Sequence, residues 1–487
     1  MNRLSTSTLG SLPRDVTVPR YDRDRVRTGI VHLGLGAFHR AHQAVVFDAA
    51  LSSGDLRWGV LGASLRSAKV RDDLNAQDGL YTLITRDHDL QNAAVVGAIG
   101  SVLVAPENPE LLVQQMCAAD VNLVTLTITE KGYHLDPGGA LLVEDRAVEA
   151  DLASLRAPQT AVGFITAALQ ARRAARLAPF TVLSCDNLPA NGEKLRAAVL
   201  QMAHAHDPAL SRWIEQEGAF PSSMVDRIVP ASEAEDITAL GSRLGVEDRA
   251  MVKTEPFFQW VIEDRFCGPR PDFAALGVQL TDDVAPWETA KLRLLNGAHS
   301  AIAYLGGLAG LEFVHEAIDR LEICAFVEKL WDEAAQTLQK PSRMNLGDYR
   351  RELLERFRNP ALQHRTRQIA QDGSQKLPQR WLAPLAWRRE RGLATDALNL
   401  AFAAWIRWQA RRDDAGKAFV VEDPLAGRLE DLLVGAQSSR QRVEAIVAGS
   451  GIVLPALASD EWIAQVSSDL ERLERAGSLA TLRERQA

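Results

Sequence analysis

A glycine turn near the start of the chain restricts its fold more than any other stretch. Residues 30–36, IVHLGLG, form a short apolar run that breaks on Gly34 and Gly36. The residues that follow, AFHRAHQAVVFDAAL, can continue as one helix. Strand, tight turn and helix predict the start of a βαβ unit, in which a bare glycine backbone can hold a dinucleotide pyrophosphate at a helix N-terminus. His39 stands where a third glycine is expected, so an ordinary β–α turn is an equal alternative.

Further apolar runs predict a mixed sheet. Residues 58–63, WGVLGA, follow a Ser-Ser-Gly turn and are expected to form the second strand of the βαβ unit. Residues 81–87 and 94–104 are separated by the polar stretch HDLQNA. We expect these two segments to be antiparallel strands inserted into the parallel pattern.

Two later strands are predicted to end in polar residues. Residues 122–129, NLVTLTIT, are rich in β-branched side chains and stop at Glu130 and Lys131, while residues 181–185, TVLSC, stop at Asp186 and Asn187. Open α/β sheets bind ligands just beyond the carboxyl ends of their strands. These polar ends are therefore candidate parts of a binding site.

The second half of the chain is predicted to be mostly helical. Strand signals become scarce after about Pro286, and apolar residues recur at helical spacing in residues 323–338, in residues 397–408 and near the C-terminus. A chain of 487 residues also exceeds what one hydrophobic core usually serves. We expect an α/β domain over residues 1–284 and a mostly α-helical domain over residues 285–487.

Composition and charge favour a globular enzyme. Apolar residues make up 46% of the chain and charged residues 24%, and the net charge of -8 comes without a stripe of Lys and Arg, which argues against nucleic acid as a partner. The N-terminus lacks the apolar core of a signal peptide, and the longest uncharged run, 294–311, contains polar residues and glycines, so we expect no membrane span and a cytoplasmic protein. A monomer is the default expectation.

Cysteine usage argues against a metal or disulfide framework. No two of the four cysteines are close enough in sequence for a C-x-x-C pattern, and we expect reduced thiols. They are Cys117, Cys185, Cys267 and Cys324. A zinc dehydrogenase is therefore disfavoured.

A polar stretch precedes an uncharged helix in the second half. In KLRLLNGAHS, residues 291–300, an α-helix would place Lys291, Asn296 and His299 at about 0°, 140° and 80°, and Arg293 on the other side at about 200°. Reduction of a ketone by hydride leaves an alkoxide, which needs a proton donor and hydrogen-bond donors. A buried lysine can supply the proton, and the amides of Asn187 and Asn296 can hold the charge without a metal.

Simpler interpretations of these residues stay open. His299 can equally be a core histidine whose hydrogen bonds are satisfied, and Asn296 can make a helix–helix contact. Lys291 can be a surface lysine with a buried stem. Arg66 and Lys69, which follow the second predicted strand, favour an NADP 2′-phosphate or the adenine ring, but a solvated helix start explains them equally well.

Seven segments spread over most of the chain carry distinctive motifs. They are HLGLGAFHRAHQA (32–44), DGLYTLITRD (78–87), TITEKGYH (127–134), SCDNLPANG (184–192), MVDRIVP (224–230), PFFQWVIEDRF (256–266) and KLRLLNGAHSAIAYLGGLAG (291–310). Through this set the chain resembles the polyol-specific long-chain dehydrogenases, the family of mannitol 2-dehydrogenase and fructuronate reductase (D-mannonate oxidoreductase).

The resemblance implies a Rossmann-type dinucleotide-binding domain, a largely helical C-terminal domain and a metal-free site in the cleft between them. Lys291 matches the family's catalytic acid/base, Asn187 and Asn296 match the amides that hold the alkoxide, and His299 and Asp226 match residues that line the substrate site. The matches to the cofactor site are Gly34, Gly36, Ala37 and Phe38 in the turn, and Glu130 and Lys131 near the nicotinamide.

The resemblance predicts NAD as the cofactor, with NADP also open. Mannitol-type members carry acidic residues after the second strand, where this chain has Arg66 and Ser67. The motifs QWVIEDRF and KLRLLN favour the fructuronate reductase branch, with mannitol 2-dehydrogenase or a broad-range polyol dehydrogenase as the alternative.

The substrate is expected to be a small sugar alcohol, ketose or hexuronate. A hexuronate carboxylate calls for a cation, and Arg367, Lys376 and Arg380 in RQIAQDGSQKLPQR are candidates, although a solvated loop explains them equally well. A non-catalytic nucleotide-dependent sugar sensor is the alternative from another functional class.

Overall fold

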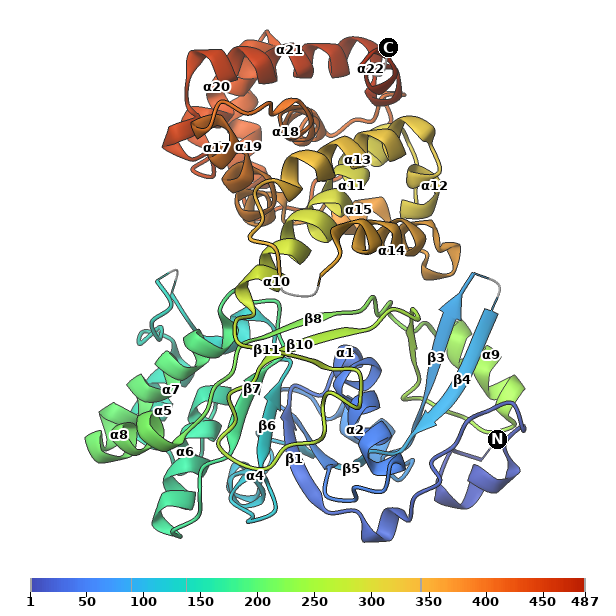
Figure 1. Cartoon of the computed structure of the whole chain (residues 1–487), viewed down its shortest axis with the longest axis vertical. Helices are drawn as coiled ribbons and strands as arrows, with labels where there is room; N and C mark the ends of the chain where they lie inside the picture. The colour runs from blue at the N-terminus through green and yellow to red at the C-terminus, as the bar shows by residue number, and fades with distance from the viewer. Residues whose placement is uncertain (1, 89, 137, 342–343, 486–487) are drawn as a thin grey trace. The chain divides into compact units, whose positions relative to one another are not determined.

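The computed structural model describes residues 2–88, 90–136, 138–341 and 344–485. The chain forms two compact units, Met1–Ala285 and Pro286–Ala487 (Figure 1). Each unit has its own secondary-structure class. The first contains all the named strands among the described residues, and the second is built from helices.

The first unit is built on a five-stranded parallel sheet in the order β5-β2-β1-β6-β7. Its strands are β1 (Thr28–Leu33), β2 (Gly59–Ser64), β5 (Ile99–Val104), β6 (Leu123–Leu126) and β7 (Thr181–Ser184). The chain builds outward from β1 through β2 to β5, and then continues on the other side of β1 with β6 and β7. The order therefore reverses between β1 and β6, which is the topological switch point where doubly wound sheets bind their ligands.

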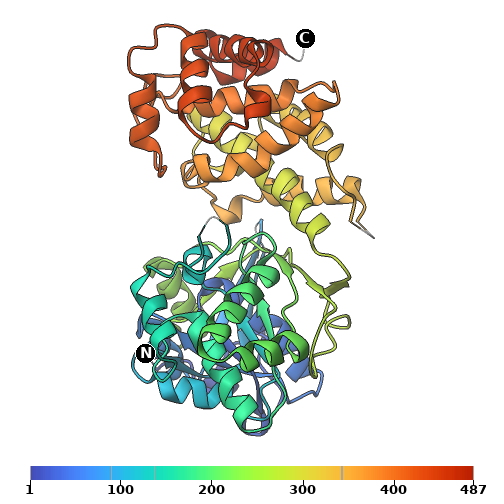
Figure 2. The same cartoon turned by 90° about the vertical axis from the view of Figure 1, so that its left-hand side faces the viewer.

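Helices cover both faces of this sheet, which explains the continuous apolar runs of its strands. On one face Val31 and Leu33 belong to a core shared with α6 (Ala161–Ala174) and α7 (Asn191–His206), and on the other Ile30 packs with α2 (Gln43–Ser52) (Figures 1 and 2). The remaining helices of this unit are α1 (Ala37–Ala41), α3 (Lys69–Asn75), α4 (Pro109–Met116), α5 (Arg146–Ala153), α8 (Pro208–Glu217) and α9 (Ala234–Leu244).

One strand prediction was wrong. Residues 94–104 do not form a single antiparallel strand: β4 (Leu90–Val96) pairs antiparallel with β3 (Tyr81–Asp87), but residues 99–104 form β5, parallel to β2. The chain changes sheets at Gly97, whose backbone N–H donates to Asp48 Oδ1 at 2.7 Å. A Cβ at Gly97 would lie 2.9 Å from Pro19 Cγ, so this change of direction is packed against the N-terminal segment.

Two small sheets complete the first unit. In one of them β9 (Val252–Thr254) pairs with β3 on the side opposite to β4. In the other, β10 (Gln259–Glu263) lies between β8 (Ser223–Asp226) and β11 (Gln279–Thr281).

The helix after the glycine turn was also predicted incorrectly, because it is interrupted at His42. The backbone of His42 leaves the helical region, with φ -123° and ψ -88°, so that α1 ends at Ala41 and α2 begins at Gln43. His42 Nε2 lies 2.9 Å from the carbonyl oxygen of Gln259, and its ring lies against Phe258 with 4.5 Å between ring centroids. These contacts come from a distant part of the chain, so local periodicity does not reveal the break.

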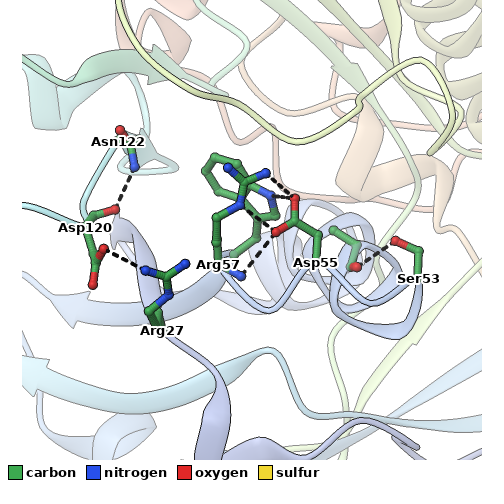
Figure 3. A network of polar contacts seen from close by, with 8 residues as sticks. Arg27, Ser53, Asp55, Arg57, Asp120 and Asn122 are labelled. Carbon is green, nitrogen blue, oxygen red and sulfur yellow. Dashed lines mark hydrogen bonds and ion pairs between the residues drawn. The ribbon is translucent and has the colours of Figure 1, made fainter.

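Polar contacts hold the amino edge of the parallel sheet, opposite to the glycine turn (Figure 3). Before β2, Asp55 accepts hydrogen bonds from Arg57 Nε and Nη2 and from Trp58 Nε1, each at 2.7 Å. Before β1, Arg27 lies 3.4 Å from Asp120 on the segment that leads into β6. The Arg27–Asp120 pair joins the segments that enter β1 and β6, and the backbone N–H of Arg27 donates to the carbonyl oxygen of Leu56, on the segment that enters β2, at 2.8 Å.

In the second unit the helix α11 (Gly297–Leu308) is buried along its whole length. It packs against α13 (Leu321–Ala335), α15 (Thr366–Ile369) and α18 (Asp396–Trp408), and α10 (Ala285–Ala290) precedes it in the chain. The other helices are α12 (Val314–Ile318), α14 (Leu346–Arg358), α16 (Gly373–Leu377), α17 (Ala383–Glu390), α19 (Ala426–Leu433), α20 (Ser439–Gly449), α21 (Asp460–Ala476) and α22 (Ser478–Glu484). The prediction of a helical second half is confirmed.

None of the helices among the described residues combines the length and the apolar character needed to cross a lipid bilayer.

Candidate active site

The two glycines of the turn after β1 have different roles. Gly34 has φ +88°, and a Cβ there would lie 2.2 Å from the carbonyl oxygen of Thr127, so the backbone itself requires glycine. Gly36 has φ -95°, and a Cβ there would meet only the carbonyl oxygen of Gly34, at 3.8 Å. The space beside Gly36 is open, as close approach of a pyrophosphate would require.

A buried hydrogen-bonded chain holds this turn. The hydroxyl of Thr127 donates to the carbonyl oxygen of Gly34 at 2.8 Å and lies 2.9 Å from His32 Nε2. Because that hydroxyl proton is already used, His32 Nε2 carries a proton and donates, while Nδ1 accepts from Thr125 Oγ1 at 2.8 Å. Burial lowers the pKa of His32 to about 3, which keeps the ring neutral.

His39, in the place of the usual third glycine, packs on this chain. Its ring stacks on His32 with 3.4 Å between centroids and 17° between the ring planes, and both side chains are fully buried. A third glycine normally allows close contact between helix and strand. Here a flat imidazole stacked on an imidazole makes that contact.

Asp186, at the end of β7, anchors the segment that follows β6. Its carboxylate accepts from the backbone N–H groups of Ile128 at 3.0 Å and Thr129 at 2.9 Å, and from the hydroxyl of Tyr133 at 2.7 Å. Burial raises the pKa of Asp186, and the three donors oppose that shift. Thr129 has φ +65°, a conformation rare for a threonine, so the carboxylate holds a strained backbone in place.

These contacts bring three predicted site segments to the carboxyl edge of the sheet, at its switch point. They are the turn with Ala37 and Phe38, the segment with Glu130 and Lys131, and the end of β7 with Asn187. Glu130, Lys131 and Asn187 are exposed, whereas Ala37 and Phe38 are partly buried.

No acidic side chain follows β2 directly. Ser64 at its end donates to the carbonyl oxygen of Ser67 at 2.6 Å, and Lys69 pairs with Asp73 at 2.9 Å. Arg66 is exposed and makes no hydrogen bond or ion pair with any residue that the structure describes.

The predicted substrate residue Asp226 ends β8 and is 4% exposed. The start of β8 is tied to the end of β7, because Asn191 Nδ2 donates both to the carbonyl oxygen of Asp186 at 3.0 Å and to that of Ser223 at 2.8 Å. Asp226 and Asn187 therefore lie on two segments that are joined by hydrogen bonds.

In the second unit, the predicted α-helical geometry of the polar stretch was wrong. Lys291–Asn296 form a π-helical turn, called here the π turn, and Lys291 is 7% exposed. An α-helix would place Lys291 and Asn296 about 140° apart. A π turn holds an additional residue, so each residue advances through a smaller angle and Asn296 returns closer to the side of Lys291. Arg293 lies away from this side and donates to the carbonyl oxygen of Thr337 at 2.6 Å.

His299 lies in the first turns of α11, in an apolar and cationic surrounding. It is 7% exposed, its ring lies 4.5 Å from that of Phe357, and its Nε2 has no hydrogen-bond partner among the described residues. Burial, followed by the nearby His364, Arg356 and Arg380, holds the pKa of His299 well below its usual range. His299 is therefore a neutral imidazole.

The three candidate cations lie in different places. Arg380 Nη1 donates to the carbonyl oxygen of Asn296 at 3.2 Å and to Ser300 Oγ at 2.8 Å, beside the π turn. Lys376 donates to the carbonyl oxygen of Gln371 at 2.6 Å.

Arg367 lies elsewhere in the unit. Its guanidinium stacks over the ring of Phe419 at 5.3 Å and lines a pocket beside Gly307. Gly307 is about 12 Å along α11 from His299, at 1.5 Å per residue. Among the three cations, the structure brings Arg380 to the polar turn and does not bring Arg367 there.

Several residues that shape the site were missed by the sequence prediction. They are His32, Thr127, Trp331 and Trp381, whereas Asp186 was among the polar strand ends expected from the sequence. A polar residue within or directly after a buried strand was a usable signal for the first two. The two tryptophans had no local signal, because their partners are backbone carbonyl groups far away in sequence.

Comparison with known proteins agrees with this arrangement. The family model described as the mannitol dehydrogenase Rossmann domain matches residues 28–275, and the model described as the mannitol dehydrogenase C-terminal domain matches residues 283–474. The chain belongs to the mannitol dehydrogenase family. Its α/β fold, with a Rossmann domain followed by a mostly helical domain, is the one expected from the sequence.

Members of the mannitol dehydrogenase family with different names are similar to this chain. "Uncharacterized oxidoreductase YeiQ" of Escherichia coli (strain K12) is 43% identical over 92% of this chain and 91% of that protein. D-mannonate oxidoreductase of the same organism is 38% identical over 95% and 96%. The structure of Pseudomonas fluorescens mannitol 2-dehydrogenase in ternary complex with NAD and D-mannitol is 35% identical, covers 99% of both chains and has a TM-score of 0.87. The chain is thus an oxidoreductase of this family.

Among the described residues, no group of three or more His, Cys, Asp or Glu side chains is arranged to hold a metal ion.

Proposed function

We propose that this protein transfers hydride between a nicotinamide cofactor and a secondary alcohol or ketone of a sugar derivative, with Lys291 as the acid/base group. The observation that carries the proposal is the π turn, which has a buried lysine at one end and an asparagine at the other and is followed by a neutral histidine. Family membership supports the same reaction.

The glycine turn of the first unit fits a dinucleotide. We assign Gly34, Gly36, Ala37 and Phe38 to the pyrophosphate side, and the segment with Glu130 and Lys131 to the nicotinamide side. When bound, the cofactor supplies the hydride acceptor or donor. The open space beside Gly36 and the anchored loop after β6 are the features that support this assignment.

The protein's own groups handle the proton and the negative charge. For oxidation, Lys291 must be neutral to take the hydroxyl proton, and for reduction the charged lysine returns it. Amide N–H groups of Asn187 and Asn296 donate to the alkoxide oxygen as charge develops. A neutral His299 can hydrogen-bond a substrate hydroxyl without adding charge, and we assign Asp226 to substrate hydroxyl binding as well.

The structure around β2 supports use of both cofactors. NAD-specific sites usually place a carboxylate on the ribose hydroxyls, and an arginine nearby accommodates a 2′-phosphate. Here Arg66 is exposed and Ser64 ends the strand. We propose NAD as the cofactor, with NADP accepted.

For the substrate we place the fructuronate reductase (D-mannonate oxidoreductase) type first. Arg380 is the candidate cation beside the π turn. A guanidinium binds a carboxylate more strongly than it binds the uncharged hydroxyls of a polyol. Mannitol 2-dehydrogenase activity is the alternative, supported by the similarity to the mannitol 2-dehydrogenase structure.

A substrate panel tests the reaction. Purified protein is assayed at 340 nm with mannonate, mannitol, sorbitol and arabinitol, each with NAD and with NADP. The proposal predicts turnover that falls about 10²–10⁴-fold in Lys291→Ala, the usual contribution of a general acid/base. Lys329→Ala, at an exposed lysine of the same unit, is the matched control. Normal turnover of the Lys291 variant would refute the assignment, and cofactor binding without any turnover would favour a sensor.

The substrate type is tested at Arg380. Replacement by methionine is expected to raise the KM for mannonate more than that for mannitol, because only mannonate has a carboxylate. If wild-type protein oxidised mannitol or arabinitol far better than mannonate, the alternative would replace the proposal.

A further inference from the structure

The π turn that carries Lys291 and Asn296 is held by side chains from elsewhere in the second unit. A π turn replaces i→i+4 hydrogen bonds by i→i+5 bonds, and the N–H of Gly297 accordingly donates to the carbonyl oxygen of Leu292, and also to that of Leu294. Such turns inside α-helices are rare, and the carbonyl groups that they displace from the regular ladder need other donors.

Two buried indoles add donors, one at this turn and one at the first residue of α11. Trp331 Nε1 donates to the carbonyl oxygen of Leu294 at 2.8 Å, and Trp381 Nε1 donates to that of Gly297 at 3.1 Å. Trp331 is 0% exposed and Trp381 is 1% exposed. Both hydrogen bonds are shielded from water, so neither indole N–H could turn to solvent if its bond were broken.

The two tryptophans come from well-packed elements. Trp331 lies in α13, and its ring stacks with Phe357, which in turn contacts His299. Trp381 lies in a second π-helical turn, η6 (Pro378–Leu382), which packs against the first. Its ring meets that of Tyr304 edge-on, with 6.0 Å between centroids. The donors are therefore fixed before any substrate binds.

Pro378 begins the second π turn, and Pro384 follows that turn by two residues, one helical turn after Arg380. Proline has no backbone N–H, and its ring collides with the carbonyl group one turn earlier, so a helix that continues through proline must widen locally. The widened turn presents Arg380 and Trp381 to the carbonyl groups of Asn296 and Gly297.

We infer that Trp331 and Trp381 are positioning residues, which set the register of Lys291 against Asn296 by holding the carbonyl oxygen of Leu294 in the π turn and that of Gly297 directly after it. If the turn relaxed into a regular α-helix, one residue would be absorbed and Lys291 would rotate by about 100° relative to α11. A shift of that size would remove the lysine from the side that it shares with Asn296. The effect on catalysis rests on the proposed role of Lys291. The two indole hydrogen bonds to Leu294 and Gly297, called here the clamp, do not depend on that role.

The test removes one indole N–H at a time and leaves a smaller aromatic ring in its place. Trp331→Phe and Trp381→Phe are compared with Trp462→Phe, a matched control in the same unit. Trp462 is 0% exposed, stacks on Phe402 and donates Nε1 to Asn399 Oδ1 at 2.8 Å, in a contact that does not involve the π turn. All three variants lose one buried indole hydrogen bond and the same ring volume, and in W462F the lost acceptor is a side-chain amide oxygen.

Two measurements are made on each variant. Amide hydrogen exchange of the peptide covering residues 291–300 is expected to be at least tenfold faster in W331F and W381F than in W462F, because only the first two release the turn. Turnover is expected to fall about 10-fold to 100-fold in the same two variants, with unchanged KM for the cofactor and a shifted pH profile of kcat. W462F should keep the wild-type turnover and pH profile even if its melting temperature falls.

Each outcome decides a separate point. Amide exchange in W331F and W381F equal to that in W462F would overturn the clamp. Faster exchange in W331F and W381F, with a kcat and pH profile equal to those of W462F, would overturn the positioning role. If either phenylalanine variant fails to fold, 3-benzothienylalanine at the same position keeps the ring and removes only the donor. A wild-type protein that turns over none of the tested substrates would defeat the proposed function, while the exchange measurement would still judge the clamp.

Discussion

Alanine at Gly34 and at Gly36 should separate the folding role of the glycine turn from its cofactor role. At Gly34 an alanine must adopt φ +88°, which costs about 1–2 kcal/mol for an L-residue. Its Cβ would also lie 2.2 Å from the carbonyl oxygen of Thr127, and overpacking of this kind costs roughly 1–3 kcal/mol. The sum is about 2–5 kcal/mol, and at about 2–4 °C per kcal/mol the melting temperature should fall by roughly 4–20 °C.

At Gly36 the same substitution should leave the fold intact. The φ of -95° is accessible to alanine, and its Cβ would meet only the carbonyl oxygen of Gly34 at 3.8 Å. Alanine also lowers the entropy of the unfolded chain, which stabilises a protein by about 0.4–1 kcal/mol where the backbone permits it. The added methyl group would, however, occupy the space that we assign to the pyrophosphate. NADH affinity should therefore fall at least about tenfold, which corresponds to about 1.4 kcal/mol.

The assay combines thermal unfolding with titration of NADH fluorescence. Gly100→Ala serves as the control, because a Cβ at Gly100, on β5, would meet only the carbonyl oxygen of Val60 at 3.9 Å. Wild-type NADH affinity in the Gly36 variant would refute the assignment of this turn to the pyrophosphate. An unchanged melting temperature in the Gly34 variant would refute the argument that the backbone requires glycine there.

Three further predictions concern side chains of the first unit. Asp186→Asn should turn an amide N–H toward a backbone N–H donor such as that of Thr129. This should lower the free energy of unfolding by about 1–3 kcal/mol and raise the KM for the cofactor. Wild-type stability and KM in this variant would contradict the anchoring role. The pKa of Asp55 is lowered to about 2, chiefly by Arg57, so its contribution is present above the unfolded pKa and is lost as pH falls from about 4 to about 2. Because Arg57 is half exposed, that contribution should be only about 1 kcal/mol. Urea unfolding of Asp55→Asn should therefore show the full stability loss at pH 6 and only about half of it at pH 3. Arg66→Asp should raise the KM for NADP at least tenfold relative to NAD, and an unchanged KM ratio would show that Arg66 does not contact a 2′-phosphate.

Much of the fold was predictable because its main signals are local. The strands of the parallel sheet are short apolar runs, and the helices α13 and α18 carry apolar stripes with the helical period. The glycine turn was recognisable because a positive φ at Gly34 needs glycine whatever surrounds it. The change of sheet at Gly97 and the break at His42 escaped prediction because Pro19 and Gln259, which are distant in sequence, hold those positions.

For the candidate site, residue types were predictable and their arrangement was not. Lys291, Asn296 and His299 stand out in an otherwise uncharged stretch, and their chemistry follows from their side chains. The π turn that relates them depends on the indole donors of Trp331 and Trp381. The same applies to the cations, because Arg367 and Arg380 belong to one polar segment but lie in different surroundings.

The amino-acid sequence by itself determined the order of strands and helices and the chemical groups available for proton transfer, because apolar periodicity and residue type are properties of neighbouring residues. Tertiary structure alone decided where helices break, which sheet a strand joins, and which side of the turn Lys291 occupies. These features depend on hydrogen-bond partners that are brought together only when distant segments pack.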